Sequence, residues 1–419
     1  NLFRRLFGEG AFSQAFMPNL VKVSQKGLFC AEILIKLSLA MLGLSLIVML
    51  FAPLVTKALA FGFSPETIAL AVPLVRINFW YLLAIFIVTL LSALLQYKNH
   101  FATTAFSTAL LNISMITALL LALNLDQKSA AMYLSWGVVA GGMLQVLSHI
   151  IALKKLNLLR LLNLGIVKFA KGKRAKAKGF WQNFGHGIIG SSANQLSDFI
   201  STFIASFLAT GAISYLYYAN RIFQLPLALF AIALSTAIFP KIAKEIKSKN
   251  DTNAINLLKK SFSLLFFLLI FSTIGGFVLA NEIIWLLFQR GEFNTQNTIE
   301  SAKVLQMYML GLLPFGLYKL FSLWLYAKMQ QKIAAKIAIY SLFINTALCL
   351  LLFKPLGASG LALAGSISGL FLLGYAIFVF GIRQFLDIIF NRINLITIIL
   401  AVIFGYLLIE LRNVIYANL

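Results

Sequence analysis

Long apolar segments recur along the whole chain, and they constrain the fold more than any other feature. A run of about 20 apolar residues is long enough to cross a hydrocarbon core about 30 Å thick. Hydrophobic residues make up 61% of the 419 positions and charged residues only 11%. This composition is typical of a polytopic membrane protein and excludes an ordinary soluble globule. We therefore expect an all-α membrane protein.

The sequence predicts eleven full spans after a partial opening helix in residues 1–26. The eleven predicted spans are 29–55, 67–96, 102–124, 130–153, 182–209, 212–238, 261–288, 302–326, 333–353, 358–381 and 393–410.

Basic residues cluster in alternate connections between these spans. The formal net charge is +23, and the Lys and Arg side chains that produce it follow the opening helix and the second, fourth, sixth, eighth and tenth full spans. The intervening connections carry acids: Glu66, Asp126, Glu282, Glu292 and Glu300. Cytoplasmic loops of membrane proteins are enriched in Lys and Arg, so the basic set is predicted to be cytoplasmic and the acidic set periplasmic. The basic charge is thus explained by topology, and we expect no nucleic-acid partner.

The longest basic connection is 154–181. It combines an amphipathic stretch with the run KGKRAKAK at 171–178. An amphipathic, Lys/Arg-rich segment is suited to lying on an anionic cytoplasmic leaflet. For the basic run, a solvated tether between two halves of the molecule is an equally good interpretation.

Three weak echoes indicate an internal duplication. Residues 18–22, 91–98 and 111–114 resemble 240–244, 321–328 and 344–346, in the same order and at similar offsets. Transporters built from such repeats place the substrate between their halves. We expect two pseudo-symmetric helical lobes around a central cavity. The predicted divisions are an N-terminal lobe at 1–153, a linker at 154–181, a C-terminal lobe at 182–353 and additional helices at 354–419.

The opening segment places charge beside a predicted span. Arg4, Arg5 and Glu9 lie in LFRRLFGEGAFSQAF, and charge inside a membrane normally faces a partner or a water-filled cavity. Alternatively, the two arginines snorkel at a helix end. The same letters resemble the signature of the MurJ (MviN) family, the lipid II flippases of the bacterial inner membrane. That resemblance implies a helix lining a cationic cavity, with Arg4 as a pyrophosphate ligand and Arg5 and Glu9 close by.

A second segment carries the same resemblance. The string YYANRIFQLP at 217–226 is similar to the family's Tyr-Tyr-Ala-Asp-Arg segment, which makes Arg221 the cavity arginine of the second lobe. Asn220 replaces the usual Asp and makes the pocket more positive. Lys319 lies inside an apolar span at a position that is cationic in the family. Guanidinium groups suit a pyrophosphate, because they offer forked donors and stay charged.

Further polar positions lie inside predicted spans. Asp198 could pair with a cavity cation or bind a coupling Na⁺ or proton, and the sequence leaves both open. Asn112 and Asn345 are expected to form interhelical hydrogen bonds and not to bind substrate.

Signatures of catalysis and of metal binding are missing from the sequence. There is no phosphate-binding Gly-Lys-Ser/Thr loop, no His-Glu-x-x-His and no nucleophile elbow. Cys30 and Cys349 both lie in apolar runs without metal-ligand spacing. We expect a protein that is not an enzyme and has no cofactor, driven by membrane potential, by a Na⁺ or H⁺ gradient, or by downstream consumption of its product.

The resemblance implies a multi-pass inner-membrane flippase of the multidrug, oligosaccharidyl-lipid and polysaccharide exporter superfamily. Its substrate would be lipid II, its other partners membrane lipids, and its expected state a monomer. Against the family, this sequence would lack the first helix and a final one. The alternatives are an exporter of another cargo, either a polysaccharide-lipid flippase or a drug/cation antiporter. An exporter of cationic drugs would require an acidic pocket, whereas the predicted site is cationic. A third alternative, a membrane-embedded glycan polymerase or ligase, would require a large periplasmic catalytic loop, and the predicted periplasmic loops are too short.

Overall fold

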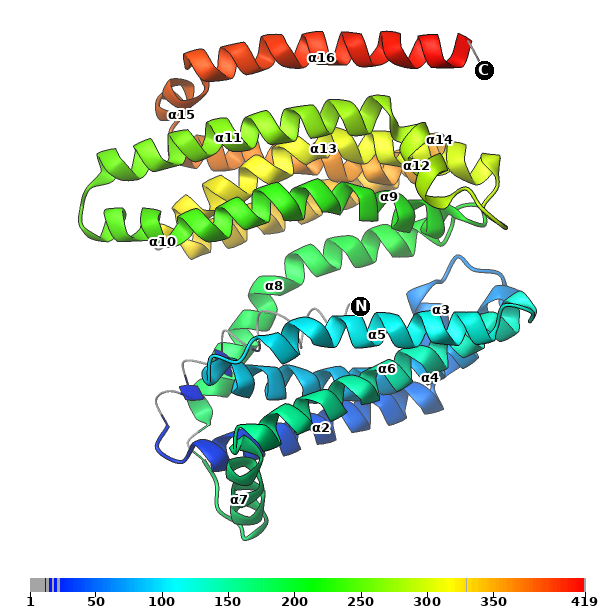
Figure 1. Cartoon of the computed structure of the whole chain (residues 1–419), viewed down its shortest axis with the longest axis vertical. Helices are drawn as coiled ribbons and strands as arrows, with labels where there is room; N and C mark the ends of the chain where they lie inside the picture. The colour runs from blue at the N-terminus through cyan, green and yellow to red at the C-terminus, as the bar shows by residue number, and fades with distance from the viewer. Residues whose placement is uncertain are drawn as a thin grey trace. The chain divides into compact units, whose positions relative to one another are not determined.

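The computed structural model describes residues 12, 15, 16, 19, 20, 23–175, 177–328 and 330–417. This part of the chain is built from helices and contains no strand (Figure 1). It divides into two compact units, residues 1–195 and 196–419. The expected all-α polytopic fold is confirmed, while the four predicted domain limits stay a prediction.

The first unit contains six complete helices and the beginning of a seventh. They are α2 (Lys26–Leu50), α3 (Ala52–Leu59), α4 (Pro65–Tyr97), α5 (Ala102–Leu121), α6 (Gln127–Lys155), α7 (Leu158–Ala170) and the start of α8 (Lys178–Ala205).

The second unit contains the remaining helices. They are the end of α8, α9 (Ala212–Pro226), the π-helical η2 (Leu227–Ile232), α10 (Ala233–Lys247), α11 (Asp251–Val278), α12 (Ala280–Phe288), α13 (Thr295–Ala327), α14 (Gln331–Phe380), α15 (Ile382–Ile389) and α16 (Arg392–Ala417).

Each predicted span falls on helical residues, but several boundaries differ. The span predicted at 29–55 breaks at Phe51, and the span predicted at 261–288 breaks at Leu279. Nine helices of the described residues are long and apolar enough to cross a membrane. The count is below eleven because α8 contributes only the shorter apolar segment Leu196–Ala205 and because α14 holds two predicted spans.

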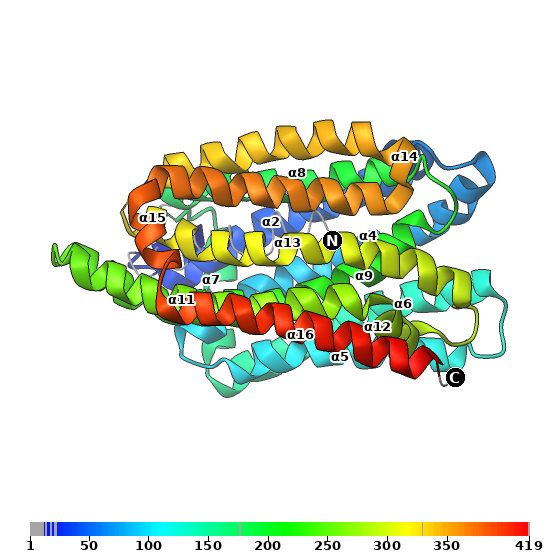
Figure 2. The same ribbon diagram turned by 90° about the horizontal axis from the view of Figure 1, so that it is seen from above.

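The helix α14 is a hairpin of two helices. Its backbone leaves the helical region at Gly357, with φ 58° and ψ −137°, a conformation that glycine adopts without a Cβ clash. The two halves run side by side (Figure 2), and Ser341 Oγ donates to the carbonyl oxygen of Ser368 at 3.3 Å. The predicted pair of spans 333–353 and 358–381 is thus present.

Polar caps begin several helices at the ends predicted to be periplasmic. The carboxylate of Asp126 accepts hydrogen bonds from the backbone amides of Lys128 and Ser129 at the start of α6. Bonds from Ser129 lower the pKa of Asp126, because they favour the charged form. Ser64 and Asn294 accept from the amides of Thr67 and Asn297 in the same way. Capping explains why these spans start where the apolar runs begin.

Each unit has its own apolar core. In the first unit, Phe12, Phe16, Phe29 and Phe180 are fully buried, and their ring centroids lie 5.0 to 6.3 Å apart in stacked and edge-on pairs. Aromatic rings favour such arrangements. These contacts connect the described part of the opening segment to α2 and α8.

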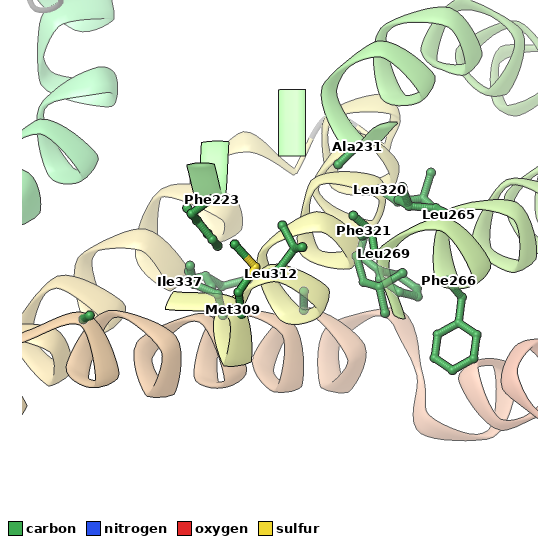
Figure 3. Packing of buried hydrophobic residues seen from close by; sticks show 14 of the residues in the cluster. Phe223, Ala231, Leu265, Phe266, Leu269, Met309, Leu312, Leu320, Phe321 and Ile337 are labelled. Atoms are coloured by element: carbon green, nitrogen blue, oxygen red, sulfur yellow. The ribbon is translucent and has the colours of Figure 1, made fainter. Parts of the chain in front are cut away.

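The core of the second unit is centred on α13. Side chains of α9, α11 and α14 converge on Met309, Leu312 and Phe321 (Figure 3). A Cβ added at Gly316 would lie 2.2 Å from Leu269 Cδ1, so the missing side chain allows α11 to approach α13 closely. Small residues are used in this way at helix interfaces in membranes.

The linker helix α7 packs against α2. The backbones of α7 and α2 are in direct contact at Gly165 and Gly27, because a Cβ added to Gly165 would lie 2.0 Å from the carbonyl oxygen of Gly27. After α7, the buried Glu32 of α2 accepts a 2.6 Å hydrogen bond from the amide of Ala175 and pairs with Lys36. The linker is therefore attached to α2 at Ala175, whereas residues 171–174 are exposed.

Candidate substrate site

The charged residues predicted in the opening segment, Arg4, Arg5 and Glu9, lie outside the described residues. The remaining predicted site residues, Asp198, Asn220, Arg221 and Lys319, all belong to the second unit. The candidate site is therefore built here from that unit alone.

Arg221 is exposed on α9 and is oriented by Tyr217, one helical turn earlier. The guanidinium carbon lies 4.6 Å from the centroid of the Tyr217 ring, and Nη2 donates a 3.0 Å hydrogen bond to the Tyr217 hydroxyl. A guanidinium has five N–H donors, so this bond leaves donor capacity for an anion. Stacking on an aromatic ring limits the orientations that the Arg221 side chain adopts.

Asn220 connects α9 to α13. Its Oδ1 accepts from Gln224 Nε2, and its side chain interacts with the Tyr308 hydroxyl of α13. These neutral partners suit an amide that stands where a carboxylate was expected from the family. The structure places Asn220 inside the unit's polar packing beside Arg221, and whether it also contacts substrate stays a prediction.

A polar cluster joins α8 to α14 and consists of Ser197, Ser201, Asn345 and Cys349. Asn345 Nδ2 donates to Ser197 Oγ at 2.9 Å, and Ser201 Oγ lies 3.7 Å from Cys349 Sγ. The interhelical hydrogen bond expected for Asn345 is confirmed. The two pairs lie four residues apart on each helix, which places them on facing sides one turn apart.

Asp198 borders this polar cluster. Its side chain is exposed on α8, its backbone oxygen accepts from Thr202, and it interacts electrostatically with Tyr308. Tyr308 and Cys349 were not predicted from the sequence. The available signal was the sequence spacing of these residues relative to Asn345 and to the serines of α8. This signal could be interpreted only with knowledge of which helices face each other.

Lys319 lies apart from this cluster. It is half-buried on α13, eleven residues after Tyr308, which corresponds to about 16 Å along a helix axis. Among the described residues no carboxylate pairs with its ammonium group. The unit therefore carries two cationic positions at different depths, Arg221 near the polar cluster and Lys319 closer to the end predicted to be cytoplasmic.

A comparison with family models decides the family. The one described as "Lipid II flippase MurJ" matches residues 1–417. The chain belongs to the MurJ family. The resemblance seen in the opening segment and around Arg221 is thus confirmed, although the roles of individual residues stay predictions.

Relatives from two bacteria agree with this assignment. The "Probable lipid II flippase MurJ" of Helicobacter pylori (strain ATCC 700392 / 26695) is 48% identical over 402 residues, which cover 93% of this chain and 87% of that protein. The "Lipid II flippase MurJ" of Burkholderia cenocepacia is 34% identical over 376 residues, which cover 87% of this chain and 72% of the relative.

Solved structures show the same fold. A "Lipid II flippase MurJ, inward closed conformation" matches with a TM-score of 0.79 and 25% identity, covering 99% of this chain and 90% of that one. An inward-facing multidrug resistance MATE family transporter of the MOP superfamily matches with a TM-score of 0.70 and 12% identity, covering 92% and 87%. Together with its membrane-length helices, MurJ family membership makes this chain a multi-pass protein of the bacterial inner membrane.

Proposed function

We propose that this chain is a flippase that moves lipid II from the cytoplasmic to the periplasmic leaflet for cell wall synthesis. Membership of the MurJ family over almost the whole chain supports the substrate class. The chain acts by transport, and we propose no resident cofactor, no covalent catalysis and a monomeric state.

The observation that carries this proposal is the exposed, tyrosine-stacked Arg221 on α9. A diphosphate at this position would receive forked hydrogen bonds from a group that stays charged at every physiological pH. The second cation, Lys319, would offer a compact charge nearer the cytoplasmic end of α13. From the family resemblance, Arg4, Arg5 and Glu9 are further proposed substrate contacts, and Asn220 would hold α9 beside α13.

For the energy source, we propose an ion gradient or the membrane potential. Asp198 supplies a carboxylate beside Tyr308, Asn345 and the α8 serines, and oxygen ligands suit a hard cation. A change in charge at Asp198 would alter the electrostatics of the Tyr308–Asn220 contact that joins α13 to α9.

Export of a cationic drug is the second candidate, because the fold is shared with MATE family transporters. That likeness concerns the fold alone. The chemistry of α9 and α13 disfavours it, because Arg221 and Lys319 would repel a cation, whereas both attract a diphosphate.

The deciding experiment replaces Arg221 in the complete protein and measures lipid II in the outer leaflet of cells. We expect Arg221→Ala to abolish delivery with normal membrane abundance, because the forked donor and its charge are both lost. Arg221→Lys should restore only part of it, since an ammonium binds phosphate without the fork.

Arg290→Ala provides a matched control. Arg290 is also exposed in the second unit, but it lies just after α12 and donates to the carbonyl oxygen of Leu286 at 2.9 Å. We expect this variant to deliver lipid II normally. Unimpaired delivery by Arg221→Ala would remove Arg221 from the mechanism.

A further inference from the structure

The corner between α6 and α7 contains a hollow of about 370 Å³. Its polar lining consists of Lys154, Asn157, Arg160 and Asn163. Asn157 makes the corner, because its φ of 57° lies in the left-handed region that Asn tolerates better than most residues. This conformation turns the chain between α6 and α7, and α7 then packs against α2.

The lining of this hollow is rich in donors and positive. Lys154 and Arg160 are exposed and offer only hydrogen-bond donors, and the two asparagine amides add more. The sequence has no Asp or Glu anywhere from 127 to 197. Both carboxylate oxygens of Glu32, the acid attached to this linker, are already engaged by Lys36 and Ala175. The hollow is therefore suited to bind a phosphate group and is not suited to bind a cation.

Apolar side chains lead into the hollow from the membrane side. Leu147 and Ile151 are 53% and 49% exposed on the turns of α6 that precede Lys154. On α7, Leu164 and Val167 line the hollow itself and are 56% and 51% exposed. Exposed apolar residues on a membrane helix contact acyl chains, and the corner belongs to the basic, cytoplasmic set of connections.

We propose that this corner binds the phosphate of an anionic phospholipid of the cytoplasmic leaflet, with the acyl chains lying along α6. Lys154 and Arg160 hold the phosphate, the asparagine amides bond to the headgroup, and Leu164 and Val167 contact the glycerol end of the tails. This site goes beyond the proposed function, because its occupant is a glycerophospholipid bound within the first unit and not the transported cargo.

The test measures phosphatidylglycerol binding to the purified full-length protein by native mass spectrometry, with phosphatidylcholine as the neutral comparison. Each surface cation strengthens the binding of an anionic lipid. The loss of two such cations lowers the affinity about 30-fold. We expect Lys154→Gln/Arg160→Gln to lose about that much affinity for phosphatidylglycerol and none for phosphatidylcholine.

The matched control is Lys171→Gln/Lys173→Gln. It removes the same charge from exposed positions of the same linker, outside the hollow. We expect nearly unchanged binding. A third variant, Asn163→Trp, keeps every charge and fills the hollow from an exposed position, so it should weaken phosphatidylglycerol binding without affecting folding.

Three results would overturn the proposal. Equal losses in the two double variants would mean that the linker attracts lipid only through its total charge. Unchanged binding by Asn163→Trp would mean that the hollow is not occupied. Competition by millimolar inorganic phosphate as effective as that of the lipid would mean that the corner binds free phosphate. Because no transport is measured, failure here leaves the flippase proposal to its own test.

Discussion

Glu32 illustrates how one buried carboxylate organises a charged segment. It is 3% exposed, yet the amide of Ala175 and the ammonium group of Lys36 both reach it. A buried charge is costly unless it is hydrogen-bonded and paired, and Glu32 has partners of both kinds. The strongly basic linker is thereby attached to α2 at a defined point.

At this residue we expect Glu32→Ala to detach the linker. Losing hydrogen bonds to a charged group costs about 2 kcal/mol, which raises the population of the detached state about 30-fold. Limited digestion with trypsin should then cleave faster after Lys173 and Arg174. Glu32→Gln keeps one acceptor for Ala175 and should fall between Glu32→Ala and the wild type.

Glu66→Ala is the control for this experiment, because Glu66 is an exposed carboxylate in the first turn of α4. Its digestion pattern should match the wild type. If Glu32→Ala also matched the wild type, the contact with Ala175 would not be what holds the linker.

At the scale of elements, contact between backbones decides how α7 lies on α2. Gly165 and Gly27 leave no room for a side chain, since an added Cβ on either would lie under 2.5 Å from a carbonyl oxygen of the facing helix. The carbonyl oxygens cannot move aside, because they belong to helix backbones and not to the ends of flexible side chains. The amphipathic pattern of α7 predicts one apolar face, and the glycine pair selects the neighbour.

We expect Gly165→Ala to destabilise the first unit by about 1 to 3 kcal/mol, the usual cost of overpacking a tight contact. Thermal unfolding of the purified protein should show a lower midpoint. Gly43→Ala tests the same change in α2, where an added Cβ meets nothing within 4 Å. It should be neutral or slightly stabilising, because Ala is the better helix former. A Gly165→Ala protein as stable as Gly43→Ala would contradict the close approach.

At the scale of the whole molecule, ion pairs within the second unit agree with the predicted topology. Lys328 pairs with Asp251 at 2.7 Å, and both lie at ends predicted to be cytoplasmic. Arg412 pairs with Glu282 at 2.9 Å, and both lie at ends predicted to be periplasmic. Each pair joins elements far apart in sequence, so a reversed helix in this unit would separate the partners.

Cysteine labelling tests the topology of the full chain. A membrane-impermeant maleimide added to spheroplasts should label Asn124→Cys and Glu292→Cys, and should reach Lys173→Cys and Ser248→Cys only after lysis. All four positions are exposed. The native Cys30 and Cys349 are fully buried, so the background should be low without removing them. Labelling of Lys173→Cys before lysis would contradict the predicted orientation.

The sequence by itself determined the fold class and the approximate positions of the spans, and it predicted their orientation. These follow from local quantities, because the length of an apolar run and the placement of Lys and Arg between runs do not depend on which helices touch. The family resemblance also came from contiguous letters around Arg4 and Arg221, and it named Asn220 and Lys319 as site residues. Asp198 was named because it is a charged residue inside a predicted span. Their distances from one another could not be read from the chain.

Only the tertiary structure decided which distant residues meet. Tyr308 reaches Asn220, Asn345 reaches Ser197, and Glu32 reaches Ala175, across separations of up to 148 residues. It also separated Lys319 from the polar cluster by three turns of α13. Such contacts depend on which helix faces pack together, and packing is set by side-chain shape and by glycines such as Gly165 and Gly316. Hydropathy contains no information on either, which is why the helices were predictable and their polar meeting points were not.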